Sequence, residues 1–397
     1  MMKLTRLFED FFSSERSGGL VLIFCTAISL VLANSPVSAH YLHVWNQDLA
    51  GHSFTYWIND ALMSVFFLLI GLELEREVYV GELSDFKSAS LPAIAALGGM
   101  VIPATIYFVS NLQSGLLAGT GIPMATDIAF AVGILSLLGS RVPPSLKVFL
   151  TALAVIDDLG AILVIAVFYT GSLHFINLFV ALAVFGGLLL LNRLKVKSLI
   201  PYLAGGVVMW YFMWNSGIHS TITGVLLAFT IPFDSGSDES PSARLLRFLH
   251  KPVAFIILPL FALANTGIVF TGGWQDIFLN AGSLGIMAGL IFGKPLGIFL
   301  FSRLWVGLHL GSLPSELRWR DILGGIGFTM SIFITMLAFQ QEAQFSHAKL
   351  AVLAASLVAG ITGFIWLRGS LRKTERSRGE TCQNSPDMNS ATERLVK

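Results

Sequence analysis

Long apolar runs, separated by short polar segments, follow one another along most of the chain. A membrane span needs about 20 mostly apolar residues to cross the hydrocarbon. Twelve segments approach this length: residues 18–34, 59–80, 91–110, 115–138, 145–170, 174–192, 199–214, 218–233, 252–270, 283–306, 321–340 and 346–367. The runs are continuous rather than alternating, and backbone groups in lipid must be paired within the segment. The pattern therefore predicts an all-α polytopic membrane protein with about 12 transmembrane helices.

The basic residues divide unevenly between the two sets of loops. If the N-terminus is cytoplasmic, all but two of the 25 Lys and Arg residues face the cytoplasm. The exceptions are Lys349, on the outer side, and Lys294, within a span. Cytoplasmic loops of membrane proteins carry an excess of Lys and Arg. We therefore expect a bacterial inner-membrane protein with both termini in the cytoplasm.

Composition agrees with a membrane protein and argues against other classes. Hydrophobic residues make up 54% of the chain and charged residues 12%, whereas soluble domains carry about 25% charged residues. The net charge of +1 gives no sign of a nucleic-acid partner. Cys25 and Cys382 are too few and too scattered for a disulfide framework. We expect a cytoplasmic N-terminus (1–17, with an interfacial helix as one option), a transmembrane domain (18–367) and a disordered polar tail (368–397).

Ionisable residues inside apolar spans require a reason, because a charge at mid-bilayer costs at least about 2.5–3.5 kcal/mol. Asp127 lies in GIPMATDIAFAVG, beside Thr126 and after Pro123. Proline breaks a helix and frees backbone carbonyls. Those carbonyls, the Thr126 hydroxyl and the Asp127 carboxylate together suit a small alkali cation. A hydrogen-bonded aspartate in a kinked structural helix is the alternative.

Two adjacent carboxylates and one lysine occupy other spans. Asp157 and Asp158 lie in the middle of ALAVIDDLGAILVIAVF and project about 100° apart on a helix. One is expected to face an ion site and the other a neighbouring helix. Lys294 needs a carboxylate partner, for which Asp157 is the first candidate and Asp158 the second. A purely structural ion pair is the alternative.

Glycines mark two further features. Four of them recur every four residues and predict a strip against which another helix packs closely: Gly285, Gly289, Gly293 and Gly297. Three more predict an unwound stretch within the span 321–340: Gly324, Gly325 and Gly327. Broken spans in two halves of a chain indicate a transport site. The span 115–138 and the span 321–340 form such a pair.

Six segments resemble the NhaA family of sodium/proton antiporters and stand in family order between about residues 17 and 368: WINDALMSVFFLLIGLELERE, ATDIAFA, LAVIDDLGAI, LPLFALANTG, FGKPLGI and GGIGFTMSIFI. This family is a known example of inverted-repeat architecture. The resemblance implies two inverted repeats with two broken helices crossing at mid-membrane. It places Asp127 and Asp158 at the cation site with Thr126, and Asp157 beside them, paired to Lys294. It also implies exchange of Na⁺ or Li⁺ for more than one H⁺, with higher activity at alkaline pH.

The resemblance also assigns a pH response to five residues, Glu73, Arg76, Glu77, His219 and His250. Solvated charges near the end of the second span, and a capping or packing role for the histidine at 219, are the alternatives. Leu246 and Arg247 replace an acidic residue and a histidine expected in the same cluster, so the strength of the pH activation is left open. The outer loop 35–58 is short and shows no evident hairpin, which leaves a homodimer through this loop open. Asp60 is interpreted as a helix-start residue.

Competition between Na⁺ and protons follows from the buried carboxylates, which are neutralised either by a cation or by protons. Two ionised carboxylates hold a charge of −2, one Na⁺ leaves −1 and two protons leave 0, so the exchange is expected to be electrogenic. Three other classes are the alternatives. The lysine beside the aspartates argues against an intramembrane aspartyl protease, and the lack of an evident selectivity filter argues against a cation channel. The three aspartates fit cation chemistry better than they fit a sodium-coupled organic-anion symporter. We expect a transporter rather than an enzyme, with no cofactor, and with membrane lipids, Na⁺, Li⁺ and H⁺ as partners.

Overall fold

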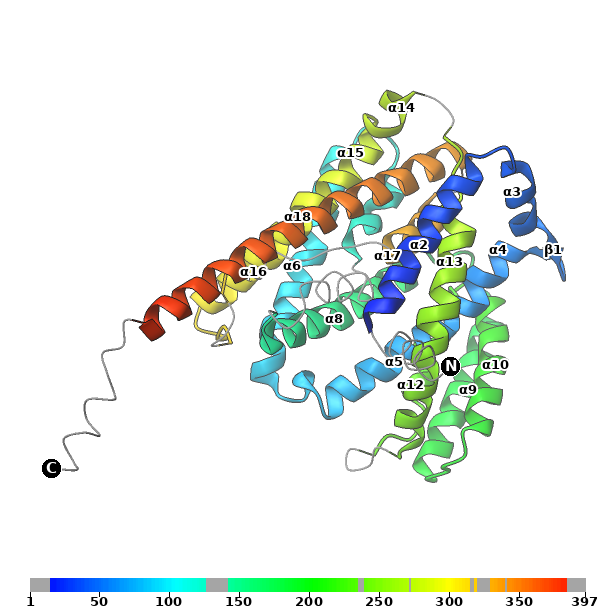
Figure 1. Ribbon diagram of the computed structural model, residues 1–397. Helices are drawn as coiled ribbons and strands as arrows, with labels where there is room; N and C mark the ends of the chain where they lie inside the picture. Colours follow the sequence, from blue (N-terminus) through cyan, green and yellow to red (C-terminus); the bar gives the residue numbers. More distant parts are fainter. Residues whose placement is uncertain are drawn as a thin grey trace, which may run out of the picture.

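The computed structural model describes residues 15–125, 142–234, 239–270, 273–314, 318–319, 329–339 and 341–383 (Figure 1). The helices in these ranges are α2 (Glu15–Ala33), α3 (Ser38–Asn46), α4 (Phe54–Trp57), α5 (Met63–Tyr79), α6 (Phe86–Ser110), α8 (Pro144–Phe168), α9 (Phe175–Arg193), α10 (Ile200–Trp214), α11 (Ile222–Ala228), α12 (Pro241–Pro252), α13 (Leu258–Thr266), α14 (Trp274–Phe278), α15 (Ala281–Ala288), α16 (Lys294–Gly307), α17 (Thr329–Ala338) and α18 (Glu342–Gln383). Three π-helical turns join some of them: η1 (Ile58–Leu62), η5 (Val253–Ile257) and η6 (Gly289–Gly293). Two segments are 3₁₀ helices: η2 (Glu82–Ser84) and η3 (Leu117–Met124). The helical class predicted from the apolar runs is confirmed.

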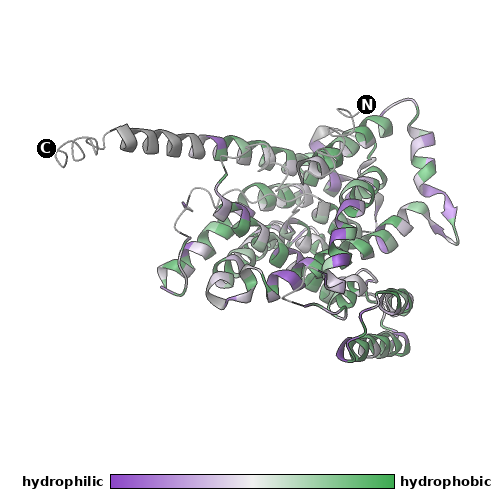
Figure 2. Ribbon diagram, turned by 60° about the horizontal axis from the view of Figure 1, so that its bottom comes forward, coloured by the Kyte–Doolittle hydropathy of each residue, from purple (hydrophilic) through white to green (hydrophobic). Residues whose placement is uncertain are grey.

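Seven helices of the described part are long and apolar enough to cross a membrane, and the bent pair α2 and α3 raises this to eight if it forms one span. Hydrophobic residues predominate along the helices (Figure 2). Large apolar side chains remain outside the bundle, as on α9, where Phe175, Ile176 and Phe179 are all more than 70% exposed. Such a continuous apolar exterior is typical of a lipid-facing surface. The count of 12 spans and the inverted repeats stay predictions, since the spans 115–138 and 321–340 run into residues outside the described part.

Helix α6 organises one side of the bundle, where it packs against α8, α15, α16 and η3 (Figure 1). Helix α5 organises the other side through contacts with α11 and α12, and α2 packs on α13. Contacts between α5 and α8 join the two sides. The predicted glycine strip faces α6: a side chain on Gly289 would meet Pro103 and Pro123, and one on Gly293 would meet Pro103 and Ile106. Helix α16 is thus held against α6 at backbone distance.

An alanine at Gly297 tests this close approach. Its Cβ would overlap the Gly98 backbone of α6 and lie 3.0 Å from Ile102 Cβ. Because backbone cannot rotate away, we expect the free energy of unfolding to fall by about 1–3 kcal/mol. SDS titration in mixed micelles measures this loss. Gly187→Ala on α9 is the matched control, since nothing lies within 4 Å of its Cβ, and an equal loss there would contradict the packing argument.

The loop between the first two spans contains a β-hairpin, so the expectation of no hairpin is wrong. Strands β1 (Asp48–Leu49) and β2 (His52–Ser53) pair antiparallel, with Leu49 opposite His52. Ala50 and Gly51 form the turn with φ of 54° and 88°, and the Gly51 amide donates to Asp48 Oδ1 at 2.7 Å. Such a turn needs positive φ at both positions and usually carries Asn-Gly or Asp-Gly. The Ala-Gly pair gave no such signal.

Two features at the C-terminal side differ from expectation. Helix α18 continues to Gln383 and so enters the segment expected to be disordered from residue 368 (Figure 1). That segment is rich in Arg, Lys and Glu, which favour helix without any apolar face. Lys349, which the distribution of basic residues places on the outer side, is 5% exposed, and its ammonium lies 3.8 Å from the centroid of the Phe345 ring. Cation–π attraction and burial of the long stem account for this position.

Candidate ion-binding site

Helix α8 carries two adjacent carboxylates into the interior of the bundle. Pro143 precedes the helix and Pro144 is its first residue, and the mostly apolar helix then continues without a break to Phe168. Asp157 and Asp158 are 0% and 1% exposed. Since adjacent helical residues project about 100° apart, the two side chains leave α8 in different directions. Burying an ionised carboxylate in an apolar interior is costly, so the charge of each must be compensated by a partner, a cation or a proton.

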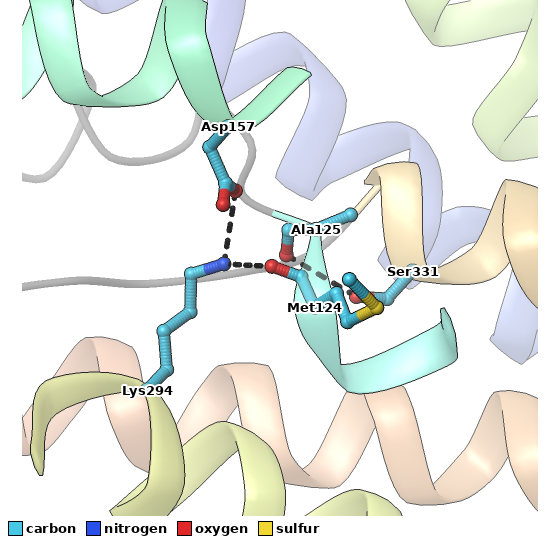
Figure 3. Close-up of polar contacts among 5 residues, drawn as sticks. All are labelled: Met124, Ala125, Asp157, Lys294 and Ser331. Atoms are coloured by element: carbon cyan, nitrogen blue, oxygen red, sulfur yellow. Dashed lines mark hydrogen bonds and ion pairs between the residues drawn. The ribbon is translucent and has the colours of Figure 1, made fainter. Parts of the chain in front are cut away.

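Lys294 approaches Asp157 from the far side of the site (Figure 3). It is the first residue of α16, directly after the π turn η6, and is fully buried. Its Nζ lies 3.0 Å from Asp157 Oδ2 and also donates to the backbone carbonyl of Met124. The Asp158 charge adds to the attraction on this ammonium. Asp157, rather than Asp158, is therefore the direct partner of Lys294 in this structure.

The end of η3 supplies backbone carbonyls to the same place (Figure 3). Pro123 lies within this 3₁₀ helix, which ends at Met124, and Ala125 is extended with ψ 144°. The Ala125 carbonyl accepts from Ser331 Oγ of α17 at 3.5 Å. The interrupted helix thus exposes two successive carbonyls, as a proline break predicts, and one of them is used by Lys294. Nothing in the sequence predicted that Met124 or Ser331 would lie at this site.

Several predicted residues lie outside the described part of the chain. Asp127 and Thr126 belong to the stretch 126–141, which directly follows Ala125. Gly324, Gly325 and Gly327 belong to 320–328, which directly precedes α17. Both stretches therefore adjoin segments that the structure places beside Lys294.

The five residues assigned to a pH response do not form one cluster. Glu73, Arg76 and Glu77 lie near the C-terminal end of α5, and His250 is exposed on α12. His219 instead lies near the other end of α5, because its neighbour Ser220 donates to Asp60. The His219 ring contacts Thr221 Oγ1 at 2.8 Å through Nδ1 and meets the Phe333 ring edge-on at 5.4 Å. On α12, Leu246 is buried and Arg247 is exposed.

Glu75 is a buried carboxylate at the α5–α12 contact that the resemblance leaves without a role. It is 3% exposed, and its Oε2 accepts from Ser242 Oγ at 2.7 Å. Ser242 lies in the first turn of α12, next to the capping residue Ser240. Helix N-termini stabilise negative charge. The burial of Glu75 could not be predicted from the sequence, because Glu73 and Glu77 beside it are acidic as well and nothing local distinguishes the three.

Replacing Ser242 with alanine removes the hydroxyl that Glu75 accepts from. An unsatisfied buried acceptor costs about 1–3 kcal/mol, so we expect the free energy of unfolding to fall by that amount. The double variant Glu75→Gln/Ser242→Ala should lose less, because it removes the buried charge as well. SDS titration measures both, with the exposed helical serine variant Ser110→Ala as control. Equal losses for Ser110→Ala and Ser242→Ala would refute the role of this contact.

Asp60 is buried, so the interpretation as a helix-start residue is wrong. The helix-start role belongs to Ser53, whose Oγ accepts from the Tyr56 amide at 3.2 Å. Asp60 lies inside the π turn η1 instead and is 6% exposed. The preceding helix α4 moves the start of the span from residue 59 to Phe54, five residues towards the N-terminus, which places Asp60 within the bundle.

Comparison with known proteins gives consistent matches over nearly the whole chain. The family model described as Na⁺/H⁺ antiporter 1 matches residues 9–367. The protein named Na(+)/H(+) antiporter NhaA of Flavobacterium psychrophilum is 60% identical over 378 residues, which cover 94% of this chain and 98% of that protein. Na(+)/H(+) antiporter NhaA 1 of Flavobacterium johnsoniae is 60% identical over 92% of this chain and 98% of its own length. The antiporter NhaA of Dechloromonas aromatica is 59% identical over 92% and 96%.

Proposed function

Because this chain belongs to the Na⁺/H⁺ antiporter 1 family, we propose that its buried aspartates and Lys294 form the site at which Na⁺ is exchanged for protons. The family resemblance found in the sequence is thereby confirmed. The chain is a multi-pass membrane transporter. One observation carries the proposal for the site: the adjacent Asp157 and Asp158 are fully buried inside an apolar span, and the buried Lys294 forms an ion pair with Asp157.

The proposed division of labour follows from this pairing. Lys294 compensates Asp157, and Asp158 binds a cation and a proton in turn. Asp127 and Thr126 complete the cation site in the proposal, because they follow the extended Ala125 that the structure places near Lys294. Carboxylate, hydroxyl and carbonyl oxygens are hard ligands that suit Na⁺, and Li⁺ by the same chemistry. Sodium and protons therefore compete for the same oxygens.

The exchange of one Na⁺ for more than one H⁺ moves net charge across the membrane. A charge that crosses the membrane gains about 2.3 kcal/mol per 100 mV. With a cytoplasmic N-terminus and an inside-negative potential, proton entry then drives Na⁺ out of the cell. The proposed role is sodium and pH homeostasis in the bacterial inner membrane, and the exposed β1–β2 hairpin offers a contact for a homodimer. The pH response of Glu73, Arg76, Glu77, His219 and His250 belongs to this proposal.

Everted membrane vesicles test the electrogenic exchange. Respiration makes their lumen acidic and positive, and added Na⁺ should then release luminal protons, measured with a fluorescent pH probe. Collapsing the potential with valinomycin and K⁺ should slow this release, because the outward movement of net positive charge loses its driving force. Vesicles without the protein are the control. A sodium-dependent proton release whose rate is the same with and without the membrane potential would contradict electrogenic exchange.

A further inference from the structure

A carboxylate outside the central site lies buried at the end of the bundle that carries the β1–β2 hairpin (Figure 1). Asp60 in η1 accepts a hydrogen bond through Oδ1 from Ser220 Oγ, which lies in the segment before α11. Its second oxygen, Oδ2, is buried and has no hydrogen-bond partner among the described residues. Trp210 Nε1 interacts with this carboxylate, but it forms no hydrogen bond of ordinary geometry within the same part of the chain. Oδ2 is thus only weakly satisfied.

The charge of Asp60 is also uncompensated by a basic residue. No Lys or Arg within the described ranges forms an ion pair with it, and the ionisable side chains that interact with it are His52 and Tyr56. The His52 ring, just before α4, stacks on the Tyr56 ring with the centroids 4.4 Å apart. Burying a carboxylate without a charged partner is costly. A cation from solution would supply the missing compensation.

The turn that carries Ser220 offers a further oxygen ligand. Thr223 Oγ1 is buried and has no hydrogen-bond partner among the described residues. It follows Ser220 by three residues, and its amide donates to the Ser220 carbonyl at 3.0 Å, so both hydroxyls lie on one face of this turn. A carboxylate and two hydroxyls are hard ligands suited to a small alkali cation. The π turn η1 repeats at Asp60 the local structure that η6 provides beside Lys294, and π turns are frequent at functional sites.

A chain of contacts connects this place with the central site. Ser220 follows His219, whose ring packs edge-on against Phe333 of α17. Two residues earlier on α17, Ser331 donates to the Ala125 carbonyl beside the Lys294–Asp157 pair. Phe333 also contacts Phe67 of α5. Asp60 and the Lys294–Asp157 pair are therefore linked indirectly through α17, with the His219 and Phe333 rings in the path.

We propose that Asp60, Ser220 and Thr223 form a second Na⁺ site, which holds the ion between the central site and the solution at the hairpin end. The proposal rests on the Na⁺/H⁺ exchange proposed above, and the orientation proposed there makes this the outer face. An ion leaving Asp158 meets the Asp60 carboxylate before it reaches bulk water. The second site lowers the KM for Na⁺ from that face only.

Asparagine at position 60 removes the charge and keeps the shape, since its amide oxygen still accepts from Ser220. Proteoliposomes that hold the protein in one orientation give the KM for Na⁺ at each face. We expect Asp60→Asn to raise the KM at the outer face about tenfold, as the loss of one charged ligand predicts, and to change the inner KM less than about twofold. Asp60→Glu retains the carboxylate and should restore most of the outer affinity. Thr223→Val, which leaves Asp60 and Ser220 in place, should raise the outer KM about threefold through loss of a neutral ligand.

The outcomes separate this site from the exchange itself. Equal KM changes at both faces, or none in Asp60→Asn and in Thr223→Val, would overturn the second site. A shifted pH profile at the outer face with an unchanged KM for Na⁺ would show a proton site and overturn it as well. If Asp60→Asn fails to fold, as its thermal unfolding midpoint shows, the Thr223→Val result decides. Wild-type proteoliposomes without Na⁺-dependent proton flux would instead refute the proposed function.

Discussion

Asparagine in place of Asp158 is expected to lower Na⁺-dependent proton movement about 100-fold at subsaturating Na⁺ while the protein still folds. The side chain is 1% exposed, Lys294 pairs with its neighbour Asp157, and in the proposed exchange Asp158 binds the cation. Losing one charged ligand costs about 3 kcal/mol, which corresponds to a flux about 100-fold lower at subsaturating Na⁺. The amide is neutral and cannot exchange a proton for Na⁺. Proteoliposomes with a luminal pH probe give the flux directly.

The control for Asp158→Asn is the same change at an exposed aspartate. Asp234 lies in an exposed position between α11 and α12, and Asp234→Asn should leave the flux unchanged. The unfolding midpoint of Asp158→Asn should be equal to that of the wild type or higher, because a buried charge has been removed. Full activity of Asp158→Asn would contradict the assignment of Asp158 to the cation site.

Breaking the Lys294–Asp157 pair gives the second large effect, and it falls on stability. In Lys294→Met, the Asp157 carboxylate loses the ammonium 3.0 Å away while remaining inside the bundle. Removing one partner of a buried ion pair costs about 3–5 kcal/mol. The double variant Asp157→Asn/Lys294→Met removes both charges, and replacing a whole buried pair is often nearly neutral. We therefore expect the double variant to be more stable than Lys294→Met alone.

SDS titration of the wild type, both single variants and the double variant closes this thermodynamic cycle. Lys147→Met on the same helix as Asp157 is the control, because Lys147 is exposed and its loss should change stability by less than about 0.5 kcal/mol. If the two single losses simply add in the double variant, the pair is not coupled. A flux assay on the double variant then separates structure from transport, because a stable protein without exchange shows that the pair acts in the cycle.

The two expected results distinguish the roles of the adjacent carboxylates. Asp158→Asn should remove transport with little effect on stability, whereas loss of Lys294 should lower stability first. This difference follows from the helical geometry, which directs the two side chains about 100° apart. Asp157 meets Lys294 of α16, and in the proposed site Asp158 faces the ion.

The sequence by itself determined the class of the protein and most of its helices. The lengths of the apolar runs placed α8, α9 and α10 within a residue or two of their observed bounds, because a span must pair its own backbone groups and needs no partner to define it. The glycine strip from Gly285 to Gly297 predicted a close helix contact for a similarly local reason, since the absence of side chains at one helical face is visible in the spacing. Buried ionisable residues were likewise found from their cost in an apolar span.

Only the tertiary structure decided which of these charges meet. The sequence left Lys294 with two candidate partners, and the packing of α16 against α6 and of α6 against α8 brings its ammonium to Asp157 and to the Met124 carbonyl. The burial of Asp60 and Glu75 was likewise decided by partners distant in sequence, Ser220 and Ser242. Such contacts depend on how whole helices pack, and no local pattern of residues specifies that. The hairpin turn at Ala50 and Gly51 could not be predicted from the sequence for a related reason. The flanking chain holds Ala50 at a positive φ, a conformation that alanine does not favour by itself.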